Sequence, residues 1–413
     1  MSLSLIVHRA THEIGGNCIE LRAPCGSRLL LDVGRPLDAL PDARGLLPAT
    51  LDLHSPVAGV VISHPHQDHY GLLNEIPRDW PVYCGEASAA LMRLTQDLTG
   101  RGLDQTFRFL KSAVPESIGP FTVTRFLTDH SAFDASMILV ECAGRRVLYS
   151  GDFRVHGRKA PLVEQLLKSL PDGIDALLLE GTNLGSVKPC VTEDELEQQF
   201  AALFMETRGR VFVSWSAQNV DRTVTLYRAA LKAKRVLAVD LYTASVLETL
   251  ENHGRIPRPG WPGLKVVVTS RFARLYRRRG NGSFVERMAK HGIAASALAA
   301  LSSRWVIMTR PSLLDDFQRN GVSPCAEDSW SWSMWRGYLD QSDGRRVRDW
   351  CETGDATARH LHTSGHASPA DLIAFARRVD ARTTIPIHGV AWDPAPNGFP
   401  HITRLADGQP HDL

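Results

Sequence analysis

The stretch that best indicates the fold and chemistry of this chain is Val57-Ala58-Gly59-Val60-Val61-Ile62-Ser63-His64-Pro65-His66-Gln67-Asp68-His69. Its first six residues are apolar, which predicts a buried strand. Three His and one Asp follow within six residues, and imidazole and carboxylate are the ligands that hydrolytic zinc uses. Two His come from one side of the turn and an Asp-His pair from the other, so the turn can supply two adjacent metal ions. The alternative is a polar loop that is His-rich by chance, and this order after a strand disfavours it.

Length and composition leave many functions open. A chain of 413 residues predicts two domains, or one domain with a large insertion. Its hydrophobic fraction of 43% and charged fraction of 22% are typical of a globular protein. The formal net charge is only +2, so nucleic-acid binding would need a local basic patch. Most basic residues are Arg, which suits bidentate phosphate contact, although genome composition can produce the same bias.

The expected location is the cytoplasm. Seven Cys are scattered along the chain without a C-x-x-C spacing, which indicates reduced thiols in a reducing compartment. The N-terminus has no basic region or cleavage site typical of a signal peptide. No apolar run approaches the roughly 18 residues that a membrane helix needs, so we expect no membrane association.

Several expected strands end at residues that can bind metal or transfer protons. Asp129-His130, Gly151-Asp152 and Glu180 each follow an apolar run, and a sheet holds such strand ends rigidly. Asp32 ends an earlier strand, where it is expected either to orient a ligand His or the metal loop, or to cap the loop. The strands are expected at residues 3–7, 18–21, 29–33, 121–126, 136–141, 147–150 and 176–179.

The pattern changes at Thr192, where a capping box with Glu195 predicts a helix start. Helices and strands then alternate, which predicts an α/β unit with parallel pairing. Past Asp355 the residue types typical of an active site return, and the strand 383–387 ends at His388. We therefore expect residues from about 200 to 350 to be inserted into a domain that the last 60 or so residues complete.

Together these motifs resemble those of a known family. The order His64-x-His66-x-Asp68-His69, His130, Asp152 resembles the dinuclear zinc form of the metallo-β-lactamase fold. Glu180, His366 in Ser-Gly-His-Ala and His388 in Pro-Ile-His-Gly resemble the additional motifs of the β-CASP nucleases. The segments 216–222, 330–332 and 337–338 resemble the inserted domain of that family, and residues 362–368 are most similar to RNase J and its relatives.

The resemblance implies an α/β fold, a metallo-β-lactamase αβ/βα sandwich with an inserted α/β β-CASP domain. The expected domains are residues 1–200, 201–352 as the insertion, and 353–413 completing the first. It implies two Zn²⁺, with Mn²⁺ as an alternative, about 3.5–4 Å apart and sharing a hydroxide that attacks phosphorus. His64, His66 and His130 would hold one ion, Asp68, His69 and His388 the other, and Asp152 would bridge. Asp68 also counts among the expected catalytic residues.

The same resemblance implies that His366 is the general acid and that Glu180 orients it. Substrate phosphate is expected at Ser364, Gly365 and Ser368, before a helix N-terminus, with Asn219 and His362 as further candidates. A grip on a 5′-monophosphate would favour 5′→3′ exonuclease action, and an open pocket would favour endonuclease action. We expect no counterpart of the extra C-terminal domain of RNase J, which leaves homodimer formation open.

Two surface features have alternatives. Arg271, Arg274 and Arg278 lie at helical spacing in a basic segment and would contact a nucleic-acid backbone or form a solvated helix face. Trp330, Trp332 and Trp335 would stack bases or, as clustered Trp more often do, pack a core.

The expected activity is zinc-dependent cleavage of RNA, or of single-stranded DNA, in RNA processing. The alternatives are a hydrolase of a small ester, thioester or lactone, and a non-catalytic nucleic-acid-binding protein. The large insertion and the pairing of His366 with Glu180 disfavour the small-ester hydrolase. Decay to a non-catalytic protein is disfavoured because every expected ligand position is filled.

Overall fold

The computed structural model describes residues 2–40, 42–299, 302–392 and 398–413. The chain forms two compact units: Met1–Cys190 with Gly365–Leu413, and Val191–Ser364. The first unit contains two mixed sheets and the second a parallel sheet, which confirms the α/β class expected from the sequence. None of the seven cysteines, all in the described ranges, forms a disulfide. Within these ranges, no helix combines the length and the apolar character needed to cross a membrane.

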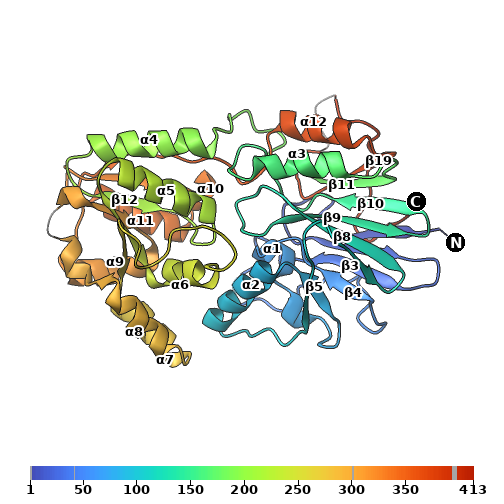
Figure 1. The fold of residues 1–413 in the computed structure, drawn as a ribbon, viewed down its shortest axis with the longest axis horizontal. Helices are drawn as coiled ribbons and strands as arrows, with labels where there is room; N and C mark the ends of the chain where they lie inside the picture. Colours follow the sequence, from blue (N-terminus) through green and yellow to red (C-terminus); the bar gives the residue numbers. More distant parts are fainter. Residues whose placement is uncertain (1, 41, 300–301, 393–397) are drawn as a thin grey trace. The chain divides into compact units, whose positions relative to one another are not determined.

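The first unit is built on two sheets (Figure 1). One has the strand order β20-β1-β2-β3-β4-β5-β6 and the other β19-β11-β10-β9-β8-β7. The strands of the first sheet are β1 Ser4–Arg9, β2 Cys18–Arg22, β3 Arg28–Val33, β4 Gly59–Val61, β5 Val82–Cys84, β6 Phe107–Phe109 and β20 Pro410–Asp412. Those of the second are β7 Pro115–Ile118, β8 Phe121–Leu127, β9 Ser136–Cys142, β10 Arg145–Tyr149, β11 Ala176–Glu180 and β19 Thr383–Ile387.

Successive residues of each strand face opposite sides of its sheet, which gives this unit a layered sandwich. Leu29 and Leu31 of β3 pack with Val140 of β9 in a core shared by both sheets. Leu30 of β3 belongs instead to a cluster on the other face of its sheet, with Met92 of a helix. Figure 1 shows helices on both outer sides of the sheets. They are α1 Gln67–Tyr70 and α2 Glu86–Thr99 on one side, and α3 Ala160–Ser169 and α12 Pro369–Val379 on the other.

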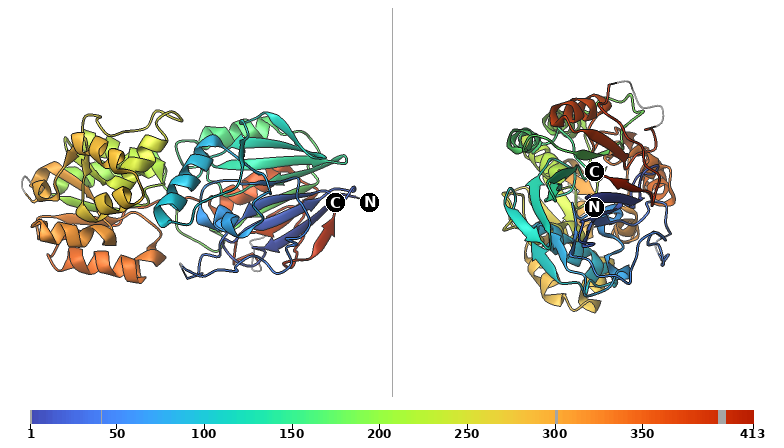
Figure 2. Two further views of the ribbon diagram at one scale, coloured as in Figure 1. Left: turned by 90° about the horizontal axis from the view of Figure 1, so that it is seen from below. Right: turned by 90° about the vertical axis from the view of Figure 1, so that its right-hand side faces the viewer.

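Segments distant in sequence complete both sheets. β19 pairs in parallel with β11, from Ala176↔Thr383 to Glu180↔Ile387. β20 pairs antiparallel with β1, and Figure 2 shows the two ends of the chain close together. Residues after 364 are therefore part of the same sandwich as residues before 191.

The second unit has a seven-stranded parallel sheet of order β15-β14-β13-β16-β12-β17-β18. The Thr192 and Glu195 capping box expected from the sequence starts its first helix. The strands β12 and β13 do not pair directly, because β16 lies between them. Its strands are β12 Val211–Ser214, β13 Val236–Asp240, β14 Leu264–Val267, β15 Gly292–Ile293, β16 Trp305–Met308, β17 Ser329–Trp332 and β18 Thr357–Ala358. Its helices are α4 Glu193–Glu206, α5 Val220–Lys232, α6 Leu241–Thr249, α7 Ser270–Arg278, α8 Gly282–Lys290, α9 Pro311–Arg319, α10 Arg336–Leu339 and α11 Ser342–Glu352.

Candidate metal centre

The histidine loop leaves the sheet at the end of β4 and turns into α1. His64 and His66 lie in the turn, and Asp68 belongs to the helix. Gly34, directly after β3, lies so close to this loop that a Cβ on it would lie 1.7 Å from the carbonyl oxygen of Asp68. Only glycine fits there, so β3 and α1 hold the loop against the sheet edge.

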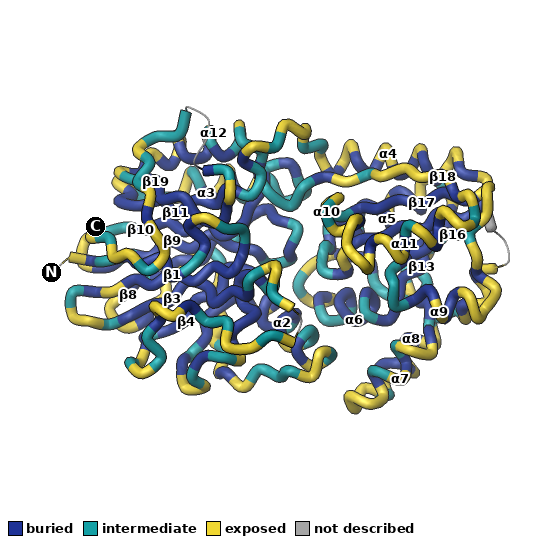
Figure 3. Tube along the Cα trace, turned by 180° about the vertical axis from the view of Figure 1, so that it is seen from behind, coloured by how far each residue is buried: buried dark blue, intermediate teal, exposed yellow. Residues whose placement is uncertain are grey.

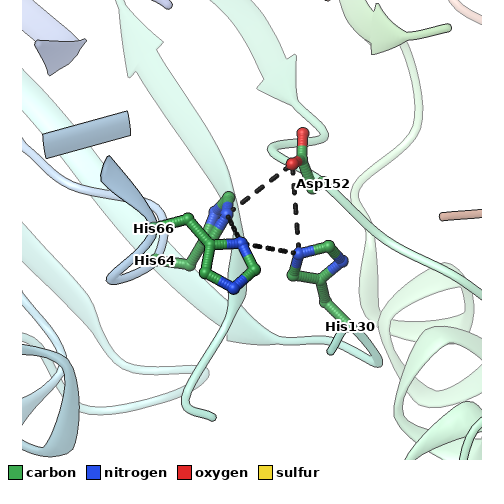
Figure 4. A group of neighbouring side chains, drawn as sticks. All are labelled: His64, His66, His130 and Asp152. Carbon is green, nitrogen blue, oxygen red and sulfur yellow. Dashed lines mark hydrogen bonds and ion pairs between the residues drawn. The ribbon is translucent and has the colours of Figure 1, made fainter. Parts of the chain in front are cut away.

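A first group of ligand-type atoms comes from three loops. His64, His66, His130 and Asp152 each offer one such atom, and these atoms lie within 4.8 Å of one another (Figure 4). Nδ1 of His66 is 3.2 Å from Nε2 of His64 and 3.2 Å from Nε2 of His130. Asp152 Oδ2 lies 3.6 Å from His64 Nε2 and 3.9 Å from His130 Nε2.

The outer nitrogens of two rings show which nitrogens carry lone pairs. His130 Nδ1 donates to the carbonyl oxygen of Gly365 at 2.6 Å. Ser63 Oγ donates to Asp32, so it accepts from His64 Nδ1 at 3.0 Å. Burial lowers the pKa of His64 and His130, which keeps both rings neutral. Both Nε2 atoms therefore direct lone pairs at His66 Nδ1, an arrangement that a cation satisfies and one proton cannot.

A second group shares Asp152 with the first. Asp68, His69, Asp152 and His388 also offer ligand-type atoms within 4.8 Å of one another. His388 Nε2 lies 3.6 Å from Asp152 Oδ1 and 3.9 Å from Asp68 Oδ2. His69 Nε2 lies 3.2 Å from Asp152 Oδ2. Burial opposes ionisation of Asp152, but His388 and His69 hold its pKa well below its usual range.

The donor set fits metal ions. Asp152 Oδ1 and His388 Nε2 are both buried and lack a hydrogen-bond partner in the part of the chain that is described. Buried polar atoms without a partner are costly, so atoms that converge in this way fit a cation. With Asp152 common to both groups, the cluster is consistent with a binuclear metal site.

Asp32 connects the strand β3 to His69 of the second group. Its carboxylate accepts hydrogen bonds from Ser63 N at 2.7 Å, His69 Nδ1 at 2.7 Å and Tyr149 OH at 2.6 Å. It is fully buried and its φ is +59°, a conformation that Asp tolerates better than most residues. The two roles considered from sequence, orienting a ligand and holding the loop backbone, are thus both present in one side chain.

His366 and Glu180 form a pair beside the two groups. His366 Nδ1 is 3.0 Å from Glu180 Oε2 and 3.9 Å from Asp152 Oδ2. Glu180, the last residue of β11, also accepts from Phe153 N at 3.0 Å, which fixes its carboxylate. Burial alone would lower the pKa of His366, but Glu180 and Asp152 raise it to about 9. The side chain of His366 keeps 21% exposure whereas Glu180 has none.

The residues expected to bind phosphate have other contacts. Ser368 accepts from Asp371 N and donates to its carboxylate in a capping box that begins α12. Gly365 gives its carbonyl oxygen to His130. In the second unit, Asn219 caps α5 by accepting from Arg222 N, and His362 Nδ1 lies 3.3 Å from Arg222 Nη1. Ser364 ends that unit, and all five residues remain predictions as phosphate ligands.

Exposure divides the three Trp candidates, whereas the three Arg candidates are all exposed. Trp330 and Trp332 are buried core residues, with exposures of 1% and 5%, so the stacking role considered for them is wrong. Trp335 is 62% exposed. Arg271, Arg274 and Arg278 all lie on α7 and are exposed.

Sequence reasoning missed several side chains that contact the clustered residues. Asn17 Oδ1 lies 2.7 Å from His388 Nδ1, and Asn17 Nδ2 donates to Tyr149 OH at 2.8 Å. Asn183 Nδ2 donates to the carbonyl oxygen of His366 at 2.8 Å. The only local signal was position: Ser63 directly precedes His64, and Asn17 follows the Gly15-Gly16 turn.

Known proteins resemble the chain in part and in whole. The family model of the metallo-beta-lactamase superfamily matches residues 13–181. Ribonuclease J of Helicobacter pylori strain ATCC 700392 / 26695 is 26% identical over 239 residues, which cover 55% of this chain and 34% of that protein. Ribonuclease J 2 of Staphylococcus aureus strain NCTC 8325 / PS 47 is 24% identical over 186 residues, covering 43% and 33%. The chain therefore spans about a third of the length of these curated relatives.

A solved structure is similar to the chain over its whole length. It is the crystal structure of a protein of unknown function from Enterococcus faecalis V583, with a TM-score of 0.81, 19% identity and full coverage of both chains. At this identity the likeness shows the fold alone. Residues 13–181 thus match the metallo-beta-lactamase superfamily, and they contribute most of a buried cluster of His and Asp side chains.

Proposed function

We propose that this protein is a zinc-dependent phosphodiesterase that cleaves RNA, with single-stranded DNA as the second candidate substrate. The observation that carries the proposal is the contact between His366 and Glu180 beside Asp152. Hydrolysis of an ester with a good leaving group needs no proton donor, whereas departure of a ribose oxygen does. The partial similarity to ribonuclease J supports the same substrate class.

The ligand roles are proposed as follows. His64, His66 and His130 hold one Zn²⁺, Asp68, His69 and His388 hold the other, and Asp152 contacts both. Two such ions, when bound, supply Lewis-acid polarisation of the phosphodiester and a nucleophile at neutral pH. The protein's part is to orient the ligand rings, through the contacts of their outer nitrogens with Gly365, Asp32 and Asn17.

His366 acts as the general acid in this proposal. Its Nδ1 donates to Glu180, which fixes the ring plane and leaves Nε2 as the nitrogen that protonates the departing oxygen. Glu180 cannot turn away easily, because Phe153 N and Thr182 N also donate to its carboxylate. Phe153 directly follows Asp152. The same short segment therefore positions the Asp152 carboxylate and, through Phe153 N, the carboxylate of Glu180.

The second unit, Val191–Ser364, is proposed to be the β-CASP domain. The proposal is supported by its parallel sheet, since the resemblance implies an inserted α/β domain. The mode of cleavage is left to experiment: 5′→3′ exonuclease action if a terminal phosphate is gripped, endonuclease action otherwise.

The test is incubation of the zinc-loaded protein with 5′-monophosphorylated and 5′-hydroxyl RNA and DNA oligonucleotides. We expect phosphodiester cleavage, with RNA preferred. His366→Ala should keep both metal ions, measured by elemental analysis, and lose most turnover. His54→Ala, an exposed His of the same unit, is the matched control and should behave as the wild type.

Two results would contradict the proposal. Turnover of a thioester or lactone without cleavage of any oligonucleotide would place the protein among small-ester hydrolases. Loss of metal from His366→Ala would show that His366 is a ligand and not the acid.

A further inference from the structure

The helix α7 carries an unusual concentration of positive charge. Four of its nine residues are Arg, Arg279 follows directly, and it contains no acidic residue. All five Arg are exposed, and Figure 3 shows this part of the second unit largely in the colour of exposed residues. The Arg residues are Arg271, Arg274, Arg277, Arg278 and Arg279.

The opposite side of α7 is fully engaged by its own unit. Ala273 and Tyr276 are buried, and the Tyr276 ring packs against Phe284 of α8 at a centroid distance of 4.8 Å. Tyr276 OH and Ser245 Oγ of α6 are 2.6 Å apart. At the helix start, Ser270 Oγ donates to Asp316 of α9 at 2.6 Å. The helix is therefore held by contacts with three neighbours, and its apolar residues are buried or half-buried.

Other exposed Arg side chains of the same unit form ion pairs with carboxylates. Arg287 forms an ion pair with Glu248 at 2.9 Å, and Arg258 pairs with Glu251 at 3.5 Å. Among the described residues, none of the five Arg side chains of α7 and its end has a carboxylate partner. Like charges along about 14 Å of helix repel one another, so this arrangement favours an external anion.

Spacing determines which groups act together. Arg271, Arg274 and Arg278 are three and four residues apart, so they leave the helix on one face. Arg277, three residues after Arg274, widens the same face. Three cations in a row suit an anion that repeats its charge along a chain.

We propose that this face of α7 binds the phosphate backbone of a nucleic-acid strand. An anionic membrane is the other common partner of a basic amphipathic helix, but such helices insert an apolar side. In α7, Ala273 and Tyr276 are buried and Phe272 and Leu275 are half-buried, so the helix has no fully exposed apolar residue to insert. The inference rests on the proposed function, because the strand that α7 would bind belongs to the substrate class proposed there.

The test compares Arg271→Gln/Arg274→Gln/Arg278→Gln with Arg287→Gln, an exposed Arg whose charge Glu248 already satisfies. Both are made in the zinc-loaded full chain carrying His366→Ala, so that cleavage is slow. Binding of a fluorescent 30-nucleotide RNA is measured by anisotropy across a salt series. Loss of three phosphate contacts should reduce the slope of log K against log salt by about 2 and weaken binding at every sequence tested. Arg287→Gln should leave the slope unchanged.

The inference is overturned if the triple variant keeps the slope of its His366→Ala parent, or if it loses binding to phosphatidylserine vesicles while its RNA binding is unaltered. Thermal unfolding at the wild-type temperature shows that the variant folds. RNA cleavage by the wild type, measured in parallel, separates the two claims. Cleavage with an unchanged slope removes only the role of α7, whereas absence of both cleavage and RNA binding removes the proposed function as well.

Discussion

Replacing Asp32 by Asn tests whether the buried carboxylate holds a metal ligand or only the loop. Asn tolerates the left-handed φ of +59° as well as Asp does, so the backbone is retained and the change is electrostatic. Asn can still accept from Ser63 N. In the wild type, His69 Nδ1 donates to the Asp32 carboxylate at 2.7 Å. The amide N–H groups of Asn would face this N–H and could not accept from it.

The expected effect is selective. Loss of a hydrogen-bond partner of a ligand His costs about 10- to 100-fold in metal affinity, which is about 1.4–2.7 kcal/mol. The ion contacted by His69 should be weakened by this amount, and the ion of the His64, His66 and His130 group should be affected less. Competition with a chromophoric chelator, followed for both ions, measures the two affinities separately.

Asp380→Asn is the matched control, because Asp380 also has a positive φ, of +48°, and is exposed at the end of α12. It should leave both affinities unchanged. If Asp32→Asn binds both ions as tightly as the wild type while the metal-free protein loses stability, the role of Asp32 is structural and the reasoning fails.

Three further predictions concern stability. Burial disfavours the charged form of Glu20, but hydrogen bonds from His8, Arg28 and Arg22 outweigh it and lower its pKa from 4.5 to about 2. This depressed pKa contributes stability that is present above pH 4.5 and lost towards pH 2, about 3 kcal/mol in all. Urea unfolding of Glu20→Gln should therefore show a shallower loss over that window, and an unchanged pH slope would contradict the assignment. Removing metal with EDTA should lower the midpoint of calorimetric unfolding and Zn²⁺ should restore it, because Asp68, Asp152 and the converging Nε2 lone pairs lose their cation; equal midpoints would argue against a resident metal. Ser368→Ala should lower the free energy of unfolding by about 1 kcal/mol through loss of the capping box; an added, selective loss of activity on 5′-monophosphorylated RNA would show that Ser368 also binds phosphate.

Much of the candidate site could be predicted because its residues follow a simple rule. His64 to His69 have ligand spacing within one turn, and Asp152 and Glu180 follow apolar runs that became β10 and β11. The pairing of His366 with Glu180 came from family resemblance, since 186 positions separate the two residues. Local sequence patterns do not report contacts over such separations.

The supporting contacts and the strand order could not be predicted for the same reason. Asn17 meets Tyr149 across 132 positions, and neither residue type indicates the other. β16 lies between β12 and β13 although it follows both in the chain, because sheet order depends on tertiary packing. Trp330 and Trp335 are the same residue type in one short segment. Trp330 lies in β17 and is buried, whereas Trp335 lies beyond the strand and is exposed.

The pairing of β19 with β11 also determines when the second sheet can be completed during synthesis of the chain. Until Thr383–Ile387 leaves the ribosome, β11 is an open sheet edge of buried apolar residues, and such edges attract other chains. The same late strand leads directly to His388. In the proposed ligand scheme, the group of His64, His66, His130 and Asp152 is therefore synthesised well before the group that needs His388, and only the second group depends on completion of the sheet.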